Sequence, residues 1–562
     1  MRKFNEIMTR NELADLLGVP RNLLTYVLYV IKPDNLYVHF DIMKKNGEPR
    51  HINAPVYELK DIQRKLADAL YQHQAIVRSE NNTKSTASHG FEKKKNIITN
   101  AAIHRNKKIV INLDLEDFFD SFHFGRVAGY FEKNRNFKLP HEVAIVIAQL
   151  ACYQGKLPQG APSSPIITNL ICEILDVHLL SIAKKYKLNY TRYADDLTFS
   201  TNDLNFLQKQ TEFFEELEKE IIRSGFNINI EKTRVQYRNA CQTVTGLVVN
   251  KKISVERSYY KRIRAMAHEL YTTGSFYIDG KEGSLNQLEG MFSFVNMLDK
   301  YNNSSLAEEK RNFRTLNGRE KQYQKFLFYK YFFNNDKTVI ITEGKTDIVY
   351  IKAALKNLYK EYPTLIEKKA NGSFVFKIAF LHRTKRLGYF FGLGEHGADA
   401  MKNLYNYFVD NNIKYAPNYL KIMQNLSKKN PKTKIIFVFD NELSNKDKPL
   451  ANFLNHAKMN STQKEELKKT LKIKLNNNLY VVTNKLVDDK NECEIEELFD
   501  ESTRSYVNRG KTFSLKSNYD KEKHYGKEIF SKYINSNYQS IDFSNFKPML
   551  DKIKDIANTT SI

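Results

Sequence analysis

Cysteine is scarce in this chain, and long apolar runs are missing. The 562 residues include 4 cysteines, which lie far apart and show no spacing typical of metal ligands. We therefore expect no disulfide framework and no zinc site, and reduced thiols in the cytoplasm fit better. No apolar run approaches the ~20 residues that a membrane span needs, and residues 1–17 contain no signal-peptide core. The sequence thus predicts a cytoplasmic protein without a membrane partner.

Positive charge, by contrast, is in excess. Lys and Arg number 88 against 64 Asp and Glu, which gives a formal net charge of +24. Such an excess attracts a polyanion, because basic contacts to phosphates release condensed counterions. Hydrophobic residues make up 41% and charged residues 27%, as in globular proteins. A chain of this length is too long for one core, so we expect several domains and a nucleic-acid partner.

Hydrophobic patterning divides the chain into two parts that both contain strands. Residues 109–113 predict a buried strand that ends at Asp114. Residues 190–200 predict two strands joined by a tight turn at an acidic pair, and residues 243–249 predict one further strand. From residue 338 onward, apolar strands alternate with helices. That alternation predicts a second, α/β part with a mostly parallel sheet.

The acidic side chains of the first part follow its predicted strands. Asp114 ends one strand, and Asp195 and Asp196 form the acidic turn. Strands that pair in one sheet can bring such side chains to one edge, where carboxylates repel each other unless a cation binds. Mg²⁺ prefers carboxylate and phosphate oxygens. Two Mg²⁺ ions held in this way could activate a primer hydroxyl and stabilise a leaving pyrophosphate.

Several strings around these aspartates occur in a fixed order. They are NLDLEDFF (112–119), LPQGAPSSPIITNL (157–170), TRYADDLTFS (191–200), GFNINIEKTR (225–234) and VTGLVV (244–249). Together they resemble the successive palm motifs of reverse transcriptases. NAAIH (100–104) and VTG (244–246) are similar to marker segments of retron reverse transcriptases, and RHINAPVYELKDIQRKL (50–66) and HGFEKKKNI (89–97) resemble the fingers of that family. The resemblance covers about residues 10–320.

This resemblance implies a multidomain α+β and α/β fold. A right-hand-like polymerase with fingers, palm and thumb would be followed by a TOPRIM-like α/β domain with a mostly parallel sheet. The expected boundaries are 1–110 for N-terminal helices and fingers, 111–250 for the palm, 251–325 for thumb and connector, 336–500 for the TOPRIM-like domain and 501–562 for a basic C-terminal tail.

The resemblance also implies roles for individual polymerase residues. Asp114 and Asp195 would bridge two Mg²⁺ ions, and Asp196 would complete the catalytic site. The implied nucleotide-binding residues are Phe119 as an aromatic gate against the 2′-hydroxyl, Gln159 and Gly160 beside the incoming nucleotide, and Lys232 at the pyrophosphate. The residues themselves leave plainer roles open, since aromatic side chains are mostly core and lysines mostly solvated.

Contacts to RNA are expected from two segments. Asn100 and His104 of the NAAIH string would touch the structured RNA, although a structural pair remains the alternative. A helix over residues 257–270 is predicted to carry an apolar stripe and a neighbouring basic stripe with Arg257, Lys261 and Arg264. The basic stripe could follow a phosphate backbone, or it could be an ordinary amphipathic surface.

In the second part, acids again follow predicted strands. Glu343 follows the strand that begins at residue 338, and Asp440 and Glu442 follow the strand at 434–439. This pattern resembles the TOPRIM pattern of topoisomerases, primases and some nucleases, except that the family places Asp where Glu442 stands. The resemblance implies that Glu343 acts as acid or base and that the three acids hold one or two Mg²⁺ ions.

Two further patterns receive plain interpretations. Glu494 and Glu496 are interpreted as a solvated helix face, with additional ligands for the second acidic site as the alternative. Gly392, Gly394 and Gly397 spell GxGxxG, which we interpret as a glycine turn rather than a dinucleotide site, because a lone motif is weak.

The function implied by the resemblance is that of a retron. The enzyme would use deoxynucleoside triphosphates and one structured non-coding RNA as template and primer, and would make branched RNA-linked single-stranded DNA. A fused TOPRIM-like nuclease effector would act in antiviral defence against phage. The alternatives are a mobile-intron-type reverse transcriptase and a nucleic-acid-binding scaffold with an inactive second domain. A homo-oligomer is left open.

Overall fold

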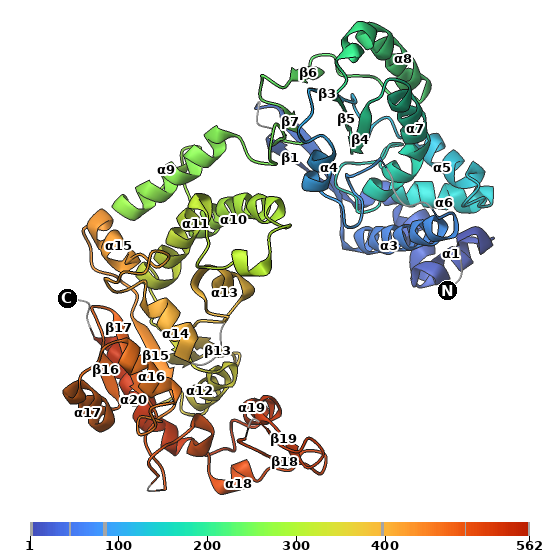
Figure 1. Ribbon diagram of the computed structural model, residues 1–562. Coiled ribbons are helices and arrows are strands. Elements are labelled where there is room, and N and C mark those ends of the chain that lie inside the picture. The colour runs from blue at the N-terminus through green and yellow to red at the C-terminus, as the bar shows by residue number, and fades with distance from the viewer. Residues whose placement is uncertain are drawn as a thin grey trace. The chain divides into compact units, whose positions relative to one another are not determined.

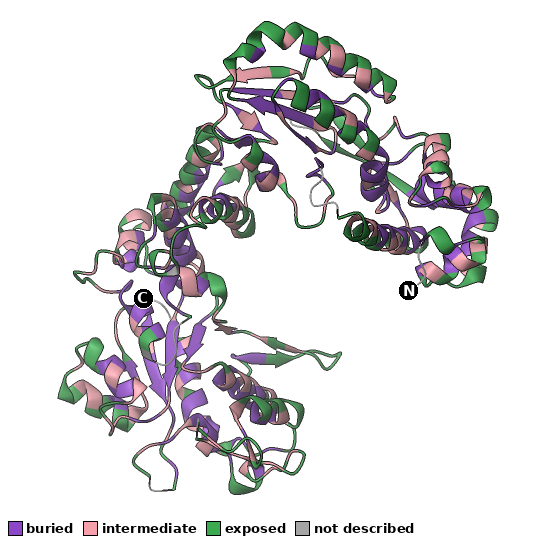
Figure 2. Cartoon of the chain, turned by 45° about the vertical axis from the view of Figure 1, so that its right-hand side comes forward, coloured by how far each residue is buried: buried purple, intermediate pink, exposed green. Residues whose placement is uncertain are grey.

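The chain folds into two compact units, Met1–Glu256 and Arg257–Ile562. A computed structural model describes residues 4–43, 47–82, 87–394, 398–488, 490–516 and 518–559. Each unit has its own hydrophobic core, and the central strands of both units are buried (Figure 2). The division falls directly before the predicted basic helix, so that helix belongs to the second unit.

An antiparallel sheet of four strands lies at the centre of the first unit (Figure 1). Its order is β4-β5-β3-β6, with β3 at Ile109–Asp114, β4 at Asn189–Tyr193, β5 at Asp196–Thr201 and β6 at Arg234–Tyr237. The strand predicted over 109–113 and the strand pair predicted over 190–200 are therefore confirmed. Helices α7 (Ser164–Lys185) and α8 (Gln210–Arg223) pack together beside the sheet.

The other elements of the first unit surround this sheet. They are η1 (Phe4–Glu6), α1 (Arg10–Leu17), α2 (Arg21–Thr25), η2 (Tyr26–Ile31), η3 (Pro33–Leu36), β1 (Tyr37–Met43), β2 (Pro49–Pro55), α3 (Tyr57–Glu80), α4 (Ile97–Ile103), α5 (Phe124–Lys133), α6 (His141–Ala151) and η4 (Leu204–Lys209). Strands β1 and β2 form an antiparallel hairpin. Helix α4 packs against β4.

Helix α7 is long and apolar enough to cross a membrane, by length and composition alone. It has 22 residues, and its most apolar window has a mean hydropathy of 1.7. The expectation that no segment reaches this length was therefore too strict, because it counted only unbroken runs. The apolar window is 67% buried inside the structure, as in a core helix.

The prediction of a single strand over residues 243–249 is wrong. The segment forms a small antiparallel hairpin instead, with β7 at Thr243–Val244 and β8 at Leu247–Val248. Thr245 and Gly246 between them both have positive φ, 46° and 77°. Two central residues with positive φ make the tight turn that suits a right-twisted hairpin, and glycine adopts this conformation without strain.

A five-stranded sheet organises the second unit, in the order β14-β11-β15-β17-β16 (Figure 1). Strands β11 (Val339–Thr342), β15 (Ile435–Phe439) and β17 (Leu479–Thr483) pair in parallel, as do β11 and β14 (Ala379–Phe380). The edge strand β16 (Lys472–Lys474) is antiparallel to β17. Nearly every residue of β11, β15 and β17 is buried, which explains their unbroken apolar sequences.

Helices and small hairpins complete the second unit. They are α9 (Arg257–Thr273), β9 (Tyr277–Ile278), β10 (Lys281–Glu282), α10 (Leu285–Asn302), η5 (Glu308–Lys310), α11 (Gly318–Phe328), η6 (Tyr329–Phe333), α12 (Lys345–Asn357), β12 (Ile366–Lys368), β13 (Phe374–Phe376), α13 (Lys385–Phe391), α14 (Ala398–Tyr405), α15 (Tyr419–Ser427), α16 (Pro449–His456), α17 (Ser461–Thr470), η7 (Ile495–Leu498), α18 (Glu501–Arg504), β18 (Thr512–Phe513), β19 (His524–Tyr525), α19 (Lys527–Ser536), η8 (Ser544–Phe546) and α20 (Lys547–Asn558).

The C-terminal segment, expected to be a basic tail, is part of this fold. Helix α19 packs against α12, and α20 packs against β17. Phe530, Phe546, Leu550 and Ile553 are fully buried in the same core as the sheet. The glycine pattern upstream is only partly described: Gly392 ends α13 with a φ of 70°, and Gly397 lies outside the described residues.

Candidate active site

Strand pairing in the first unit brings the three predicted aspartates together. Asp114 is the last residue of β3 and lies opposite Asp196, the first residue of β5. The backbone N–H of Leu115 donates to the carbonyl oxygen of Asp195 at 3.1 Å. Ala194, with a φ of 58°, closes the tight turn between β4 and β5. Three carboxylates that are distant in the sequence therefore share one edge of the sheet.

Burial and mutual repulsion perturb these acids. Burial, and then the charges of Asp195 and Asp114, raise the pKa of Asp196 to about 7. The pKa of Asp195 is also raised, by burial and then by the charge of Asp114. Lys232 Nζ donates to Asp114 Oδ1 at 2.9 Å, and this hydrogen bond raises the pKa of the lysine. The cluster is thus one in which a bound cation would be favoured.

A cavity of about 920 Å³ opens over these acids. Asp114, Asp195 and Lys232 line it together with Phe119 and Gln159, whereas Asp196 is not among its lining residues. Basic side chains also reach it, because Arg50 and Lys156 belong to the same wall. A polar cavity lined by both carboxylates and cations suits a triphosphate bound through a metal ion.

Gly160 has a clear structural purpose, whereas its expected place beside the nucleotide stays a prediction. Its φ is +119°, and a Cβ there would lie 2.8 Å from the carbonyl oxygen of Asn53. The N–H of Asn53 donates to the carbonyl oxygen of Gln159 at 2.9 Å. The glycine therefore allows β2 to approach this loop closely, and so it fixes Gln159 at the cavity wall.

The donor chemistry of this cluster fits Mg²⁺, although no site is preformed. Among the residues that the structure describes, no group of three or more His, Cys, Asp or Glu side chains is arranged to hold a metal ion. Lys232 instead neutralises Asp114, with its side chain 60% exposed. An exposed lysine can move away at small cost, because ion pairs of this kind contribute about 0–1 kcal/mol.

Asn100 and His104, expected at the RNA, are both 0% exposed. Side chains that are fully buried cannot touch RNA in this conformation. The His104 ring lies within 2.7 Å of both Ser200 Oγ and Thr191 Oγ1, and the Thr191 hydroxyl donates to Asn100 Oδ1 at 2.5 Å. Asn100 and His104 therefore link α4 to the strands β4 and β5. This is the structural role that the sequence left open as an alternative to RNA contact.

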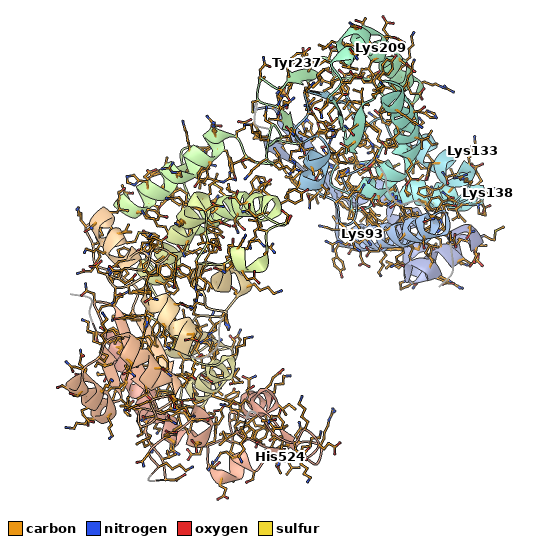
Figure 3. The ribbon with its side chains drawn as sticks, in the orientation of Figure 1. Lys93, Lys133, Lys138, Lys209, Tyr237 and His524 are labelled. Carbon is orange, nitrogen blue, oxygen red and sulfur yellow. The ribbon has the colours of Figure 1, made fainter. Side chains whose placement is uncertain are left out.

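The basic stripe of α9 is placed as the sequence predicts. Arg257, Lys261 and Arg264 are exposed, while Ile263 and Leu270 are buried. The first unit also carries exposed lysines, and Lys93, Lys133, Lys138 and Lys209 project from its surface (Figure 3). Positive charge is therefore available on both units for contacts to phosphate.

Comparison with known proteins identifies the family. The sequence model of the family described as reverse transcriptase (RNA-dependent DNA polymerase) matches residues 42–270. The retron Ec86 reverse transcriptase of Escherichia coli is 34% identical over 51% of this chain and 85% of that protein. The retron Mx65 reverse transcriptase of Myxococcus xanthus is 31% identical over 54% of this chain and 71% of that protein. The chain belongs to the retron reverse transcriptase family.

Membership decides between two alternatives that the sequence left open. This retron reverse transcriptase is an RNA-directed DNA polymerase, not a mobile-intron enzyme. Enzymes of this kind are in general Mg²⁺-dependent. Among solved structures, telomerase from Candida albicans with a fragment of telomeric RNA is 12% identical, with a TM-score of 0.31, over 52% of this chain and 60% of that chain.

A second acidic cluster lies in the other unit of this retron reverse transcriptase. Glu343 follows β11, and Asp440 follows the neighbouring parallel strand β15. Burial, and then the charges of Glu442 and Asp347, raise the pKa of Glu343 to about 7. Burial raises the pKa of Asp440 as well, with further contributions from Asp347, Glu343 and Glu496. Glu343, Asp440 and Glu442 therefore share one site.

The interpretation of Glu496 as part of a solvated helix face is wrong. Its side chain is 0% exposed, and Lys527 Nζ donates to Glu496 Oε2 at 3.0 Å and to Glu494 Oε2 at 2.9 Å. The short helix η7 covers Ile495–Leu498 of the EIEELF string, and Ile495, Glu496 and Leu498 are buried. Burial raises the pKa of Glu496 to about 7.

Sequence reasoning also missed Asp347 and Lys527. Asp347 is buried and accepts a hydrogen bond from the N–H of Gly344 at 2.7 Å, at the start of α12. An acid in the first turn of a helix that directly follows a strand was the available signal. Lys527 carried no such signal, because it lies far along the chain and reaches Glu494 and Glu496 only through the packing of α19.

Proposed function

We propose that this retron reverse transcriptase copies a structured non-coding RNA into branched RNA-linked single-stranded DNA. The same RNA would act as template and primer, and deoxynucleoside triphosphates would be the substrates. The observation that carries the proposal is the convergence of Asp114, Asp195 and Asp196 beside a polar cavity. That convergence lies within the segment that matches the family.

The three aspartates, Lys232 and Gln159 each have a role in this proposal. Asp114 and Asp195 would hold two Mg²⁺ ions, and Asp196 would complete the site. When bound, these ions activate the primer hydroxyl and stabilise the charge of the leaving pyrophosphate. Lys232 binds the pyrophosphate, and Gln159 forms the wall beside the incoming nucleotide.

Phe119 is proposed as the gate that excludes ribonucleotides. Its ring is half-buried and lines the cavity, and it packs against Phe118 and Phe91 with ring centroids 5.5 and 6.3 Å away. A ring supported in this way cannot yield readily to a 2′-hydroxyl. The alternative, a core phenylalanine, is supported by the same contacts, so Phe119→Val should raise the use of ribonucleotides only if the gate exists.

Expression together with flanking genomic DNA tests the retron proposal. Nucleic acid that co-purifies with the full chain would be digested separately with RNase, with DNase and with a debranching enzyme. An RNA–DNA hybrid that debranching separates into two parts supports the proposal. A plain RNA, with no attached DNA under conditions in which the enzyme extends an added primer, contradicts the branched product.

For the second unit, we propose a TOPRIM-like metal-dependent phosphodiester site. The parallel pairing of β11 with β15 supports it, since this pairing brings Glu343, Asp440 and Glu442 to the carboxyl ends of neighbouring strands. Glu343, with its raised pKa, suits a general acid or base, and the three acids would hold one or two Mg²⁺ ions. As a nuclease effector in phage defence, this unit would be restrained until infection.

Lysine neutralisation favours the alternative of an inactive second domain. Lys448 Nζ donates to Glu442 Oε1 at 2.5 Å, and Lys527 neutralises Glu494 and Glu496. Glu343→Gln decides between the two. Loss of phage protection and of host toxicity, with primer extension unchanged, supports the effector. Unchanged protection and toxicity would leave the unit as a scaffold.

A further inference from the structure

A chain of buried hydrogen bonds runs beneath the catalytic turn of the first unit. It joins Ser200, His104, Thr191 and Asn100, each of which is at most 1% exposed. Thr191 belongs to β4 and Ser200 to β5, while Asn100 and His104 belong to α4 and its C-terminal end. One short helix is thereby tied to the two strands that flank the turn with Asp195 and Asp196.

The direction of this chain follows from the available protons. The Thr191 hydroxyl donates to Asn100 Oδ1, so Thr191 Oγ1 must accept from Nε2–H of His104. The other ring nitrogen, Nδ1, is then the acceptor for the Ser200 hydroxyl. Burial lowers the pKa of His104 to about 3, which keeps the ring neutral, as this arrangement requires. The three hydrogen bonds of the chain thus each have a defined donor and acceptor, whereas the buried Asn100 Nδ2 has no hydrogen-bond partner.

A second set of contacts holds the same turn from the opposite face of the sheet. Successive side chains of a strand point to opposite faces, so Arg192 faces away from α4. Its guanidinium is fully buried and binds Asp176 of α7 through Nε and Nη2 at 2.8 and 2.7 Å. Its Nη1 donates to the carbonyl oxygen of Ala194 at 3.2 Å. The turn is therefore held from α4 on one side and from α7 on the other.

We propose that Asn100, His104 and Thr191 are positioning residues, which set the height of the Asp195–Asp196 turn over the polymerase cavity. They act through β4 and β5, and not by touching RNA or nucleotide. This inference rests on the proposed role of Asp195 and Asp196 as metal ligands. It assigns the NAAIH segment to the geometry of catalysis and leaves recognition of the RNA to exposed surfaces.

The polar nature of this contact favours positioning over mere packing. Apolar side chains could fill the same space without fixing its geometry, whereas hydrogen bonds need their donors and acceptors at set distances and angles. The three hydrogen bonds join α4 and its C-terminal end to β4 and β5 at 2.5 to 2.7 Å. A directional contact of this kind defines position, because a shift of about 1 Å at a reacting centre can reduce a rate by about 100-fold.

The matched variants Thr191→Val and Thr191→Ser test the proposal in the full chain. Valine keeps the shape of threonine but lacks the hydroxyl, and serine keeps the hydroxyl but lacks the methyl group. Steady-state extension of a DNA primer on an RNA template would give kcat, the KM for deoxynucleotide and the Mg²⁺ concentration for half-maximal rate. RNA affinity and the unfolding temperature would be measured beside them.

For Thr191→Val we expect kcat to fall by about 10-fold to 100-fold, the half-maximal Mg²⁺ concentration to rise, and RNA affinity to remain that of the parent. Thr191→Ser should recover most of kcat. If both variants lose the same activity, or if the loss of activity follows a loss of RNA affinity, the proposal is wrong.

Two controls keep the outcome interpretable. Should Thr191→Val not fold, Ser200→Ala removes a single hydroxyl at the other end of the chain. Unchanged kcat and Mg²⁺ dependence in Ser200→Ala would then overturn the proposal. Asp195→Asn separates this inference from the site on which it rests: if that variant stays active, the catalytic assignment fails, whereas an inactive Asp195→Asn beside a fully active Thr191→Val refutes the positioning role alone.

Discussion

The two acidic clusters of this chain use the same residue types at strand ends, but they are neutralised in different ways. In the first unit, Asp114 and Asp195 line an open cavity, and one exposed lysine binds one of them. In the second unit, Glu442 and Glu496 are buried, and each is bound by a lysine of its own. Acids of one kind therefore line an open cavity in the first unit, whereas in the second unit Glu442 and Glu496 are paired with lysines.

This difference shows that strand-end acids alone do not define a metal site. In the polymerase unit, the counter-charge is weakly held and the cavity leaves room for a triphosphate. In the second unit, Lys527 occupies the space between Glu494 and Glu496 and comes from α19, which packs against α12. A ligand that binds these two acids must displace Lys527, whose side chain is 37% exposed.

The largest expected effect separates the two clusters by activity. The double variant Asp195→Asn, Asp196→Asn should lose primer extension by about 10³-fold or more, because it removes the charges that hold the catalytic ions. Glu496→Gln in the second unit should leave extension within about twofold of the parent, as expected for an independent site in a separate compact unit. If the double aspartate variant extended primers at the parent's rate, the first cluster would not be the catalytic site and this difference between the clusters would be wrong.

The next largest effect concerns the stability of the second acidic cluster. Lys527→Met leaves Glu496 buried without its counter-charge, and breaking a buried pair costs about 3–5 kcal/mol. We expect the lower end of that range, because Lys527 is still 37% exposed. Chemical denaturation with hydrogen exchange at β15 and β17 would measure it.

The double variant Lys527→Met, Glu496→Gln supplies the control for that experiment. Removal of both charges should recover most of the lost stability, because a neutral side chain at position 496 needs no counter-charge. A single variant Lys527→Met as stable as the parent would show that this cluster is not closed by the lysine.

A smaller effect concerns the pH dependence of the first unit. The folded pKa of Asp196, about 7, lies above its ordinary value of 3.8, so protonated Asp196 favours the folded state. Its contribution is complete below pH 4 and is lost as the pH rises towards 7. Without divalent cations, we therefore expect the unfolding temperature of the first unit to fall by a few degrees across this window.

Added Mg²⁺ and the variant Asp196→Asn should each change how the unfolding temperature depends on pH. Added Mg²⁺ should recover stability at pH 7 and above, because it binds only the folded cluster. Asp196→Asn should flatten the pH dependence and weaken the response to Mg²⁺. The same Mg²⁺ titration, followed at the second unit, should give a smaller shift if its acids are closed by lysines. Equal shifts in both units would contradict the comparison.

The sequence predicted what depends on local pattern. The strands at 109–113 and 190–200 follow from short apolar and alternating runs, and they place Asp114, Asp195 and Asp196 together. The hairpin within 243–249 was missed, because an apolar run hides the positive φ of Thr245. Glu496 was assigned to a solvated face, and His104 either to an RNA contact or to a structural pair, and both are buried. Their partners, Lys527 and Thr191, lie far away in the sequence, and no local periodicity encodes such a pairing.

The smallest expected effect concerns α9, which lies in the second unit although the family match extends to residue 270. If α9 binds the RNA backbone, Lys261→Ala with Arg264→Ala should weaken RNA binding without sequence preference. The slope of log affinity against log salt should fall by about 0.7–0.9 for each phosphate contact that is lost. Lys468→Ala with Lys469→Ala on α17 is the matched control, since it removes two exposed charges from another helix. An identical change in slope from both pairs would mean that only net charge matters, and that the polymerase function ends with the first unit.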